Sequence, residues 1–330
     1  MIDGVAFDVR GPALIHGYDP PAGGMWVDDV IPGKLGALDR NSGETMWFSP
    51  CEVGYGRGFG AGFGGVEEVI VLGPSAGGPR VVRMARDTGE LLGVESIGEL
   101  DQALVFEDIC VCSSARRVFA VSTSMMSEVW EYSREGERYH HIGRCGERVL
   151  VATSSLKTRR HGVLALDTVS GEPVGALVQT VLPVIHGLAT DRSEASVLTA
   201  DLSAALPPEL AAQYLGDLSK CEEESGVEVL TDTLSLLGLS TIAPEGEAGS
   251  WYEILSTGPV EAVPEVSIAA DSGKLYVVRG ALLEVRDLLT GRILGDWTIP
   301  GLDEQVAWRV CDGAGLLAEE HRVSVFELPA

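Results

Sequence analysis

The chain has 330 residues, of which 24 are lysine or arginine and 49 are aspartate or glutamate, so its formal charge is −25 at pH 7. Such a surface repels the phosphates of nucleic acids and of anionic membranes, which are bound by clustered lysine and arginine side chains. The composition therefore argues against both ligands and favours protein partners, with basic proteins suited best.

Residues 1–4 lack the basic and apolar regions of a secretory signal, and the apolar runs of the chain are strand-sized. We therefore expect a cytoplasmic protein without membrane spans. The cysteines are irregularly spaced, which predicts buried free thiols rather than disulfides or a metal site. They are Cys51, Cys110, Cys112, Cys145, Cys221 and Cys311.

One pattern recurs along the chain, in which a short apolar strand ends at a turn containing Asp, then Ser or Thr, then Gly, before a second strand begins. Three good copies cover residues 36–47, 163–172 and 283–292, and two weaker copies cover residues 82–90 and 129–137. Glycine accepts the positive φ of a tight turn, and the Asp, Ser and Thr side chains bond to nearby backbone N–H groups. We therefore predict structural roles for Asp39, Ser42, Gly43, Asp167, Ser170, Gly171, Asp287, Thr290 and Gly291.

A glycine-rich segment at residues 53–65 interrupts this pattern. Residues 60–65 match G-x-G-x-x-G, but a nucleotide site needs a helix after that motif, and residues 66–71 read as a strand. We expect a loop between strands. Its aromatic residues are candidate partner contacts, namely Tyr55, Phe59 and Phe63.

A second interruption, at residues 206–224, favours a short helix because proline opens it and alanine is frequent. Leu210, Tyr214 and Leu218 would share one face of this helix, and an acidic tip follows at residues 221–224. The helix either packs on the edge of the domain or docks another protein.

The repeat predicts one all-β domain over residues 1–330. The turn glycines recur at roughly 35 to 47 residues, close to the period of propeller blades. We predict a β-propeller of about seven four-stranded blades, with eight and six as alternatives. A strand at residues 5–9 would complete the last blade beside the strand at residues 322–328, closing the ring with both termini.

The turn at residues 39–47, with Trp47 four residues after Gly43, resembles the repeat of the quinoprotein-type (PQQ-like) propeller family. The resemblance implies the propeller fold. The family contains quinone-cofactor dehydrogenases, outer-membrane assembly lipoproteins and cytoplasmic scaffolds. The dehydrogenases use a disulfide between adjacent cysteines and the lipoproteins a signal peptide with an acylated cysteine. Neither feature stands in this sequence, so the resemblance implies the non-catalytic scaffold branch.

Catalytic motifs are not apparent. None of the six histidines lies in an H-x-x-x-H or H-E-x-x-H pattern, and no G-x-S-x-G elbow occurs. His140 and His141 are expected in an exposed hairpin after Gly136, and the tryptophans in the blade core. We therefore expect no catalytic residue, cofactor or metal.

These observations predict a non-catalytic interaction scaffold or subunit of a cytoplasmic complex. The alternative is an enzyme or small-ligand binder that uses the central funnel of the propeller. A structural subunit of a cell-surface or viral assembly is a third possibility.

Overall fold

The computed structural model describes most of the chain, and all of its elements are β-strands. The described residues are 2–6, 11–17, 32–54, 59–64, 67–106, 108–157, 161–174, 178–182, 184–190, 195–201, 234–242, 248–259, 266–299, 307–311, 313–319 and 322–328. Within these ranges no helix has the length and apolar character needed to cross a bilayer.

The strands form antiparallel sheets in chain order. The first sheet holds β1 (Ile2–Ala6), β2 (Ala13–Gly17), β3 (Pro32–Leu38) and β4 (Thr45–Gly54). The second holds β5 (Gly60–Gly64), β6 (Glu68–Gly73), β7 (Arg80–Ala85) and β8 (Leu91–Ser96). The third holds β9 (Gln102–Val105), β10 (Ile109–Ser113), β11 (Val118–Ser122) and β12 (Glu128–Tyr132). The fourth holds β13 (Glu137–Cys145), β14 (Arg148–Ser155), β15 (His161–Asp167) and β16 (Val178–Leu182).

The remaining three sheets follow the same order. The fifth holds β17 (Val184–Thr190), β18 (Ala195–Asp201), β19 (Leu234–Ile242) and β20 (Ala248–Pro259). The sixth holds β21 (Val266–Asp271), β22 (Lys274–Arg279), β23 (Leu282–Asp287) and β24 (Ile293–Thr298). The seventh holds β25 (Ala307–Cys311), β26 (Ala314–Glu319) and β27 (Arg322–Glu327).

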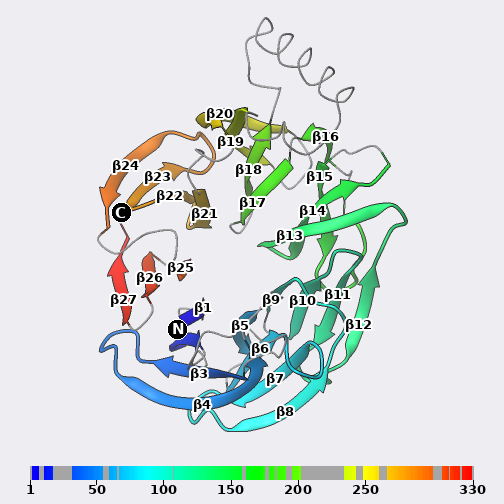
Figure 1. Cartoon of the computed structure of the whole chain (residues 1–330), viewed down its shortest axis with the longest axis vertical. Helices are drawn as coiled ribbons and strands as arrows, with labels where there is room; N and C mark the ends of the chain where they lie inside the picture. The colour runs from blue at the N-terminus through cyan, green and yellow to red at the C-terminus, as the bar shows by residue number, and fades with distance from the viewer. Residues whose placement is uncertain are drawn as a thin grey trace, which may run out of the picture.

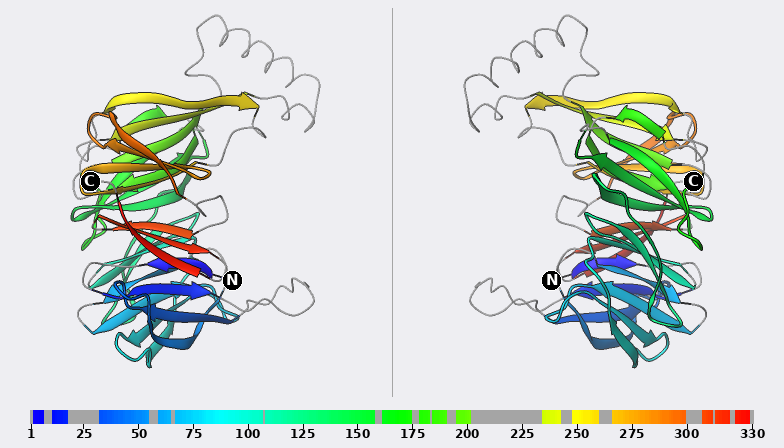
Figure 2. Two further views of the ribbon diagram at one scale, coloured as in Figure 1. Left: turned by 90° about the vertical axis from the view of Figure 1, so that its left-hand side faces the viewer. Right: turned by 90° about the vertical axis from the view of Figure 1, so that its right-hand side faces the viewer.

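The sheets stand around a common centre, and their strands run between the two faces of the ring (Figures 1 and 2). The first strand of each sheet is innermost and contacts the first strand of the next sheet, and β1 contacts β25 and β26. Ala13 of β2 packs with Leu316 and Ala318 of β26, so the first and last sheets share a hydrophobic core. The described residues thus form seven sheets in a ring, which confirms the predicted β-propeller.

The prediction that an N-terminal strand completes the last sheet is wrong. The N-terminal strand pairs with β2, with Gly4 opposite His16, and so becomes the innermost strand of the first sheet. Only a short connection separates β1 from β2, and closing a short loop costs less entropy than pairing the two ends of the chain. The last sheet is left with three strands among the described residues.

Residues 60–64 of the glycine-rich segment form the inner strand β5 where a loop was expected. Gly60 and Gly62 lie on β5, and a Cβ on either would lie 2.7 Å from the Cβ of Ala103 or Val105 on β9. The inner strands approach each other closely near the centre of the ring, and glycine permits that approach. Glycine here reflects the crowding of neighbouring sheets.

Candidate docking surface

The turns that join the third and fourth strands position the outer wall of the ring. Between β3 and β4, Asp39 Oδ1 accepts hydrogen bonds from the N–H of Ser42 at 2.8 Å and from its hydroxyl at 3.0 Å. These bonds lower the pKa of Asp39 because they favour its charged form. Gly43 completes the turn with φ of 71°. The same arrangement recurs at Asp167, Ser170 and Gly171, and at Asp287, Thr290 and Gly291.

A tryptophan joins the first sheet to the second. Trp47 Nε1 donates a hydrogen bond of 2.6 Å to the carbonyl oxygen of Arg86 in the next turn. The indole lies on Gly89, where a Cβ would come within 2.4 Å of Trp47 Cε3. The third and fourth sheets are joined in the same way by Trp130, Thr168 and Gly171.

At the junction of the second and third sheets the two residue types change places, with the glycine on the outer strand and the large residue in the turn. Gly93 on β8 occupies the position that Trp47 holds on β4, and Met126 occupies the position of the turn glycine, with φ of 57°. The Met126 side chain is buried, and its Cε lies 3.8 Å from the place of a Cβ on Gly93. In the Asp position Ser122 accepts the N–H of Met125 through its hydroxyl at 3.2 Å.

The third copy of the repeat is therefore residues 122–130, and the prediction for residues 129–137 is wrong. Gly136 has positive φ, but it lies between β12 and β13, where the chain passes from one sheet to the next. The sequence pattern missed the true copy because methionine replaces its glycine.

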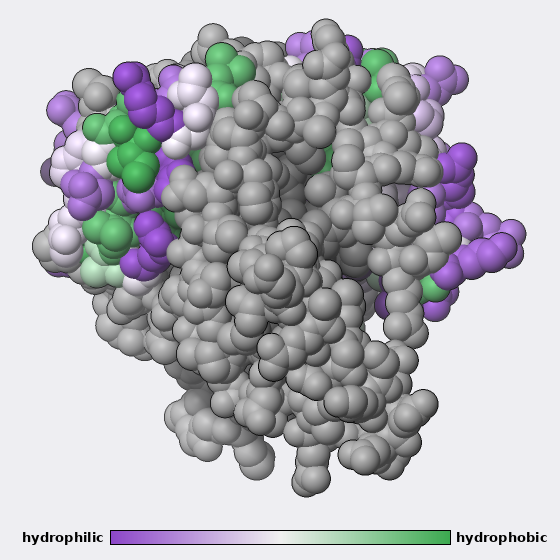
Figure 3. Space-filling view, turned by 90° about the horizontal axis from the view of Figure 1, so that it is seen from above, coloured by the Kyte–Doolittle hydropathy of each residue, from purple (hydrophilic) through white to green (hydrophobic). Residues whose placement is uncertain are grey.

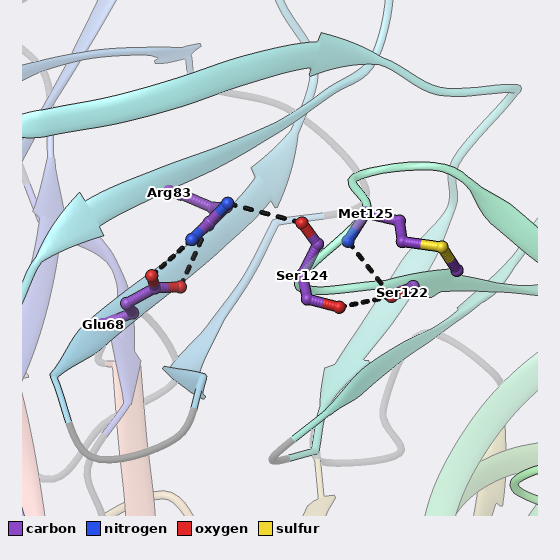
Figure 4. Close-up of polar contacts among 5 residues, drawn as sticks. All are labelled: Glu68, Arg83, Ser122, Ser124 and Met125. Atoms are coloured by element: carbon purple, nitrogen blue, oxygen red, sulfur yellow. Dashed lines mark hydrogen bonds and ion pairs between the residues drawn. The ribbon is translucent and has the colours of Figure 1, made fainter.

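An ion pair within the second sheet lies beside the reversed junction (Figure 4). Arg83 on β7 donates from Nε to Glu68 Oε2 at 2.9 Å, and a second N–H of its guanidinium binds the other carboxylate oxygen. Its remaining terminal nitrogen lies 3.5 Å from the carbonyl oxygen of Ser124 in the turn. The second sheet thereby contacts the turn that carries Met125, whose side chain is 66% exposed.

The outer strands share a β-bulge directly after these turns. In β4, β8, β12 and β24, one residue is inserted between two consecutive pairs with the neighbouring strand. A bulge residue is left out of the ladder and can project to solvent. The inserted residues are all apolar and partly exposed, Met46 by 47%, Leu92 by 49%, Val129 by 41% and Leu294 by 41%. We call these four residues the outer apolar belt.

Further exposed apolar side chains lie where the second and third sheets meet. Leu91 is exposed beside Leu92 on β8, and Met125 is exposed in the turn whose Met126 packs on Gly93. On the opposite side of the ring, where Figure 1 places β24, Figure 3 shows apolar side chains among charged ones. An apolar surface rimmed by charge is typical of protein-interaction sites.

The predicted contacts of the glycine-rich segment are not on this surface. Phe59 stacks on the ring of buried His16 with centroids 4.4 Å apart, and Phe63 lies 5.4 Å below the guanidinium of Arg86. Both rings are half-buried against the core between the first two sheets. Tyr55 lies outside the described residues.

The predicted helical insertion at 206–224, with Leu210, Tyr214 and Leu218, also lies outside the described residues. The flanking strands β18 and β19 pair with each other. The insertion therefore connects the second and third strands of the fifth sheet.

The adjacent histidines belong to inner strand β13 and not to an exposed hairpin. They occupy a bulge between Tyr139 and Ile142, and both are half-buried. His140 Nε2 lies 2.7 Å from Ser154 Oγ, and His141 Nδ1 lies 3.3 Å from the amide nitrogen of Gln102 on β9. These contacts tie β13 to its neighbours. Across the described ranges, no three His, Cys, Asp or Glu side chains are grouped to hold a metal ion.

No family model matches the sequence, and no curated protein sequence matches it. Among solved structures, the chain is similar to the crystal structure of BamB from Moraxella catarrhalis. The TM-score is 0.50 at 12% sequence identity, over 98% of this chain and 84% of the other. Similarity at this level of identity shows the fold alone, because one fold supports many functions.

Proposed function

We propose that the protein is a non-catalytic interaction scaffold, a subunit of a larger complex that docks partners on the outer wall of its propeller. The outer apolar belt carries the proposal. A single exposed leucine is ordinary in a soluble protein, but here apolar side chains recur at the inserted residue of four bulges. Repetition at equivalent positions suits a surface that contacts other proteins.

The proposed partner is a protein with a basic surface around an apolar centre. The belt supplies the apolar contacts, and the charge of −25 attracts a basic partner and steers its approach. The turns with Asp39, Asp167 and Asp287, and the packing of Trp47 and Trp130 on the turn of the following sheet, support a propeller of the quinoprotein type. Its place in the non-catalytic branch is part of this proposal.

We propose the cytoplasm as the compartment. Cys51, Cys110 and Cys112 are free thiols buried in the core, and burial raises the pKa of Cys51 to about 11. Such thiols stay protonated and unreactive, and free cysteines are typical of a reducing compartment.

Site-specific photocross-linking in the native host tests the scaffold proposal. A photoreactive amino acid at Leu92 or Val129 should yield a discrete cross-linked protein. The matched control carries the same amino acid at Glu135, which is exposed beyond the other end of β12. Equal cross-linking from all three positions, or none from any, would contradict the proposed docking surface.

A further inference from the structure

Among the described strands, none covers the outer edge of the seventh sheet, as a fourth strand does in each other sheet. β27 pairs only with β26 among the described strands, whereas six sheets carry a fourth strand. The exposure of the side chains differs accordingly. Val325 on β27 is 42% exposed, and Val285, at the equivalent place on β23, is 1% exposed.

This equivalence rests on matching backbone bonds. The N–H of Leu328 donates to the carbonyl of Gly313 at 2.8 Å, as the N–H of Leu288 donates to Gly273 at 3.0 Å. Because antiparallel strands turn alternate residues to alternate sides, the backbone N–H and C=O groups of Val325 face the open edge. In the sixth sheet β24 pairs with the corresponding edge of β23.

The exposed side chain of Trp297 on β24 lies on a face of the sixth sheet that is turned toward the seventh sheet. Trp297 on β24 lies opposite Leu283, and residues opposite each other share one face of a sheet. Leu283 packs with Leu317 and Leu328 of the seventh sheet, so this face is turned toward that sheet. The indole folds back over Gly295 and remains 38% exposed.

We propose that an extended strand of a partner protein pairs antiparallel with β27 and completes the seventh sheet. Backbone hydrogen bonds to the open edge would supply affinity, as in other cases of strand addition. The strand would place an apolar side chain against Trp297. Asp296 and Glu327 are exposed on β24 and β27, so we assign Lys or Arg to its intervening positions. The inference deepens the proposed scaffold function and rests on it.

A synthetic peptide provides the probe. It copies residues 290–299, which contain the strand that fills this place in the sixth sheet, with lysine in place of the aspartate and leucine in place of the tryptophan, so that the peptide itself does not fluoresce. We expect saturable binding, slower hydrogen exchange at the Val323 and Val325 amides, and a blue shift of Trp297 fluorescence that is lost in Trp297→Phe. The control peptide has proline at two alternate positions and should not bind.

Three variants of the protein sharpen the test. Val325→Pro removes an N–H that faces the open edge, a place where an edge strand tolerates proline, and should reduce peptide affinity at least tenfold. Val325→Ala keeps the backbone and should bind within about threefold of the original. In the third variant, a copy of residues 289–298 replaces residues 329–330. This added strand should raise Tm and abolish peptide binding.

Three outcomes would overturn the inference. They are unchanged hydrogen exchange at Val325 with the peptide, equal binding of the proline control, and a concentration-dependent dimer abolished by Val325→Pro, which would assign the edge to a second copy. These measurements use the isolated protein and β27. Their failure is therefore distinct from failure of the cross-linking at Leu92 and Val129.

Discussion

Two neighbouring junctions of the ring, between the first and second sheets and between the second and third, are packed in opposite ways. Each pairs one large side chain with a glycine, but the large side chain comes from different sides. In the first, Trp47 reaches across to Gly89, and in the second, Met126 reaches back to Gly93. Both fill the space between an outer strand and the neighbouring turn. A large side chain thus packs against a glycine at both junctions, but it comes from the outer strand at the first and from the turn at the second.

The comparison explains how the ring supports a surface. In β4, β8 and β12 the residue before the junction position is the exposed bulge residue. The junction residues Trp47 and Trp130 pack on the turn of the next sheet, whereas Gly93 of β8 receives Met126 from that turn. One local irregularity therefore both packs the ring and displays the belt. The first role should appear in stability and the second in binding.

Removing a tryptophan should have the largest effect. Trp47→Ala deletes a buried indole and its hydrogen bond to Arg86, which we expect to cost about 4 kcal/mol in the free energy of unfolding. Trp47→Phe keeps most of the ring and should cost about half as much. Urea denaturation measures both. A loss below about 1 kcal/mol for Trp47→Ala would show that the indole does not hold the junction.

Crowding the same junction should have the next largest effect. Gly89→Ala combines a positive φ with a Cβ directed at Trp47, and we expect a loss of about 3 kcal/mol. Gly43→Ala is the matched control, since its φ is also positive but no atom lies within 4 Å of the added Cβ. That variant should lose about 1 kcal/mol. Equal losses would mean that backbone strain alone explains the glycine.

The reversed junction should be convertible into the ordinary one. Met126→Gly leaves a cavity and Gly93→Trp overfills the site, so each alone should lose about 2 kcal/mol. The double variant restores a tryptophan opposite a glycine and should lose less than the sum, with a coupling of about 2 kcal/mol. Additive losses would show that the two junctions are not equivalent.

The smallest effect concerns charge in the turns. Hydrogen bonds lower the pKa of Asp39, Asp167 and Asp287. Their charged forms therefore stabilise the fold above the unfolded value of about 3.9, and this contribution is lost as pH falls through the folded pKa. Replacing all three by Asn should lower Tm slightly at pH 7, and this difference should vanish once the pH lies below the lowered pKa values of the folded state. A Tm difference that persists in acid would exclude a role for the charge.

Much of the ring could be predicted from sequence, because the Asp39, Asp167 and Asp287 turns are recognisable from local chemistry. The Met126 turn could not, since its glycine is replaced and only packing against Gly93 explains the exchange. Gly60 and Gly62 read as a loop because the crowding of inner strands is a tertiary effect. The belt was missed for a similar reason, as bulges depend on the register between strands.

The most direct test asks whether the outer apolar belt binds a partner or stabilises the ring. In a variant with Met46, Leu92, Val129 and Leu294 all changed to Ser, the free energy of unfolding should fall by no more than about 2 kcal/mol in total. Cross-linking from a photoreactive residue at neighbouring Leu91 should disappear at the same time. Unchanged cross-linking in a folded variant, or a loss of stability comparable to that of Trp47→Ala, would show that the belt belongs to the packing of the ring and is not a docking surface.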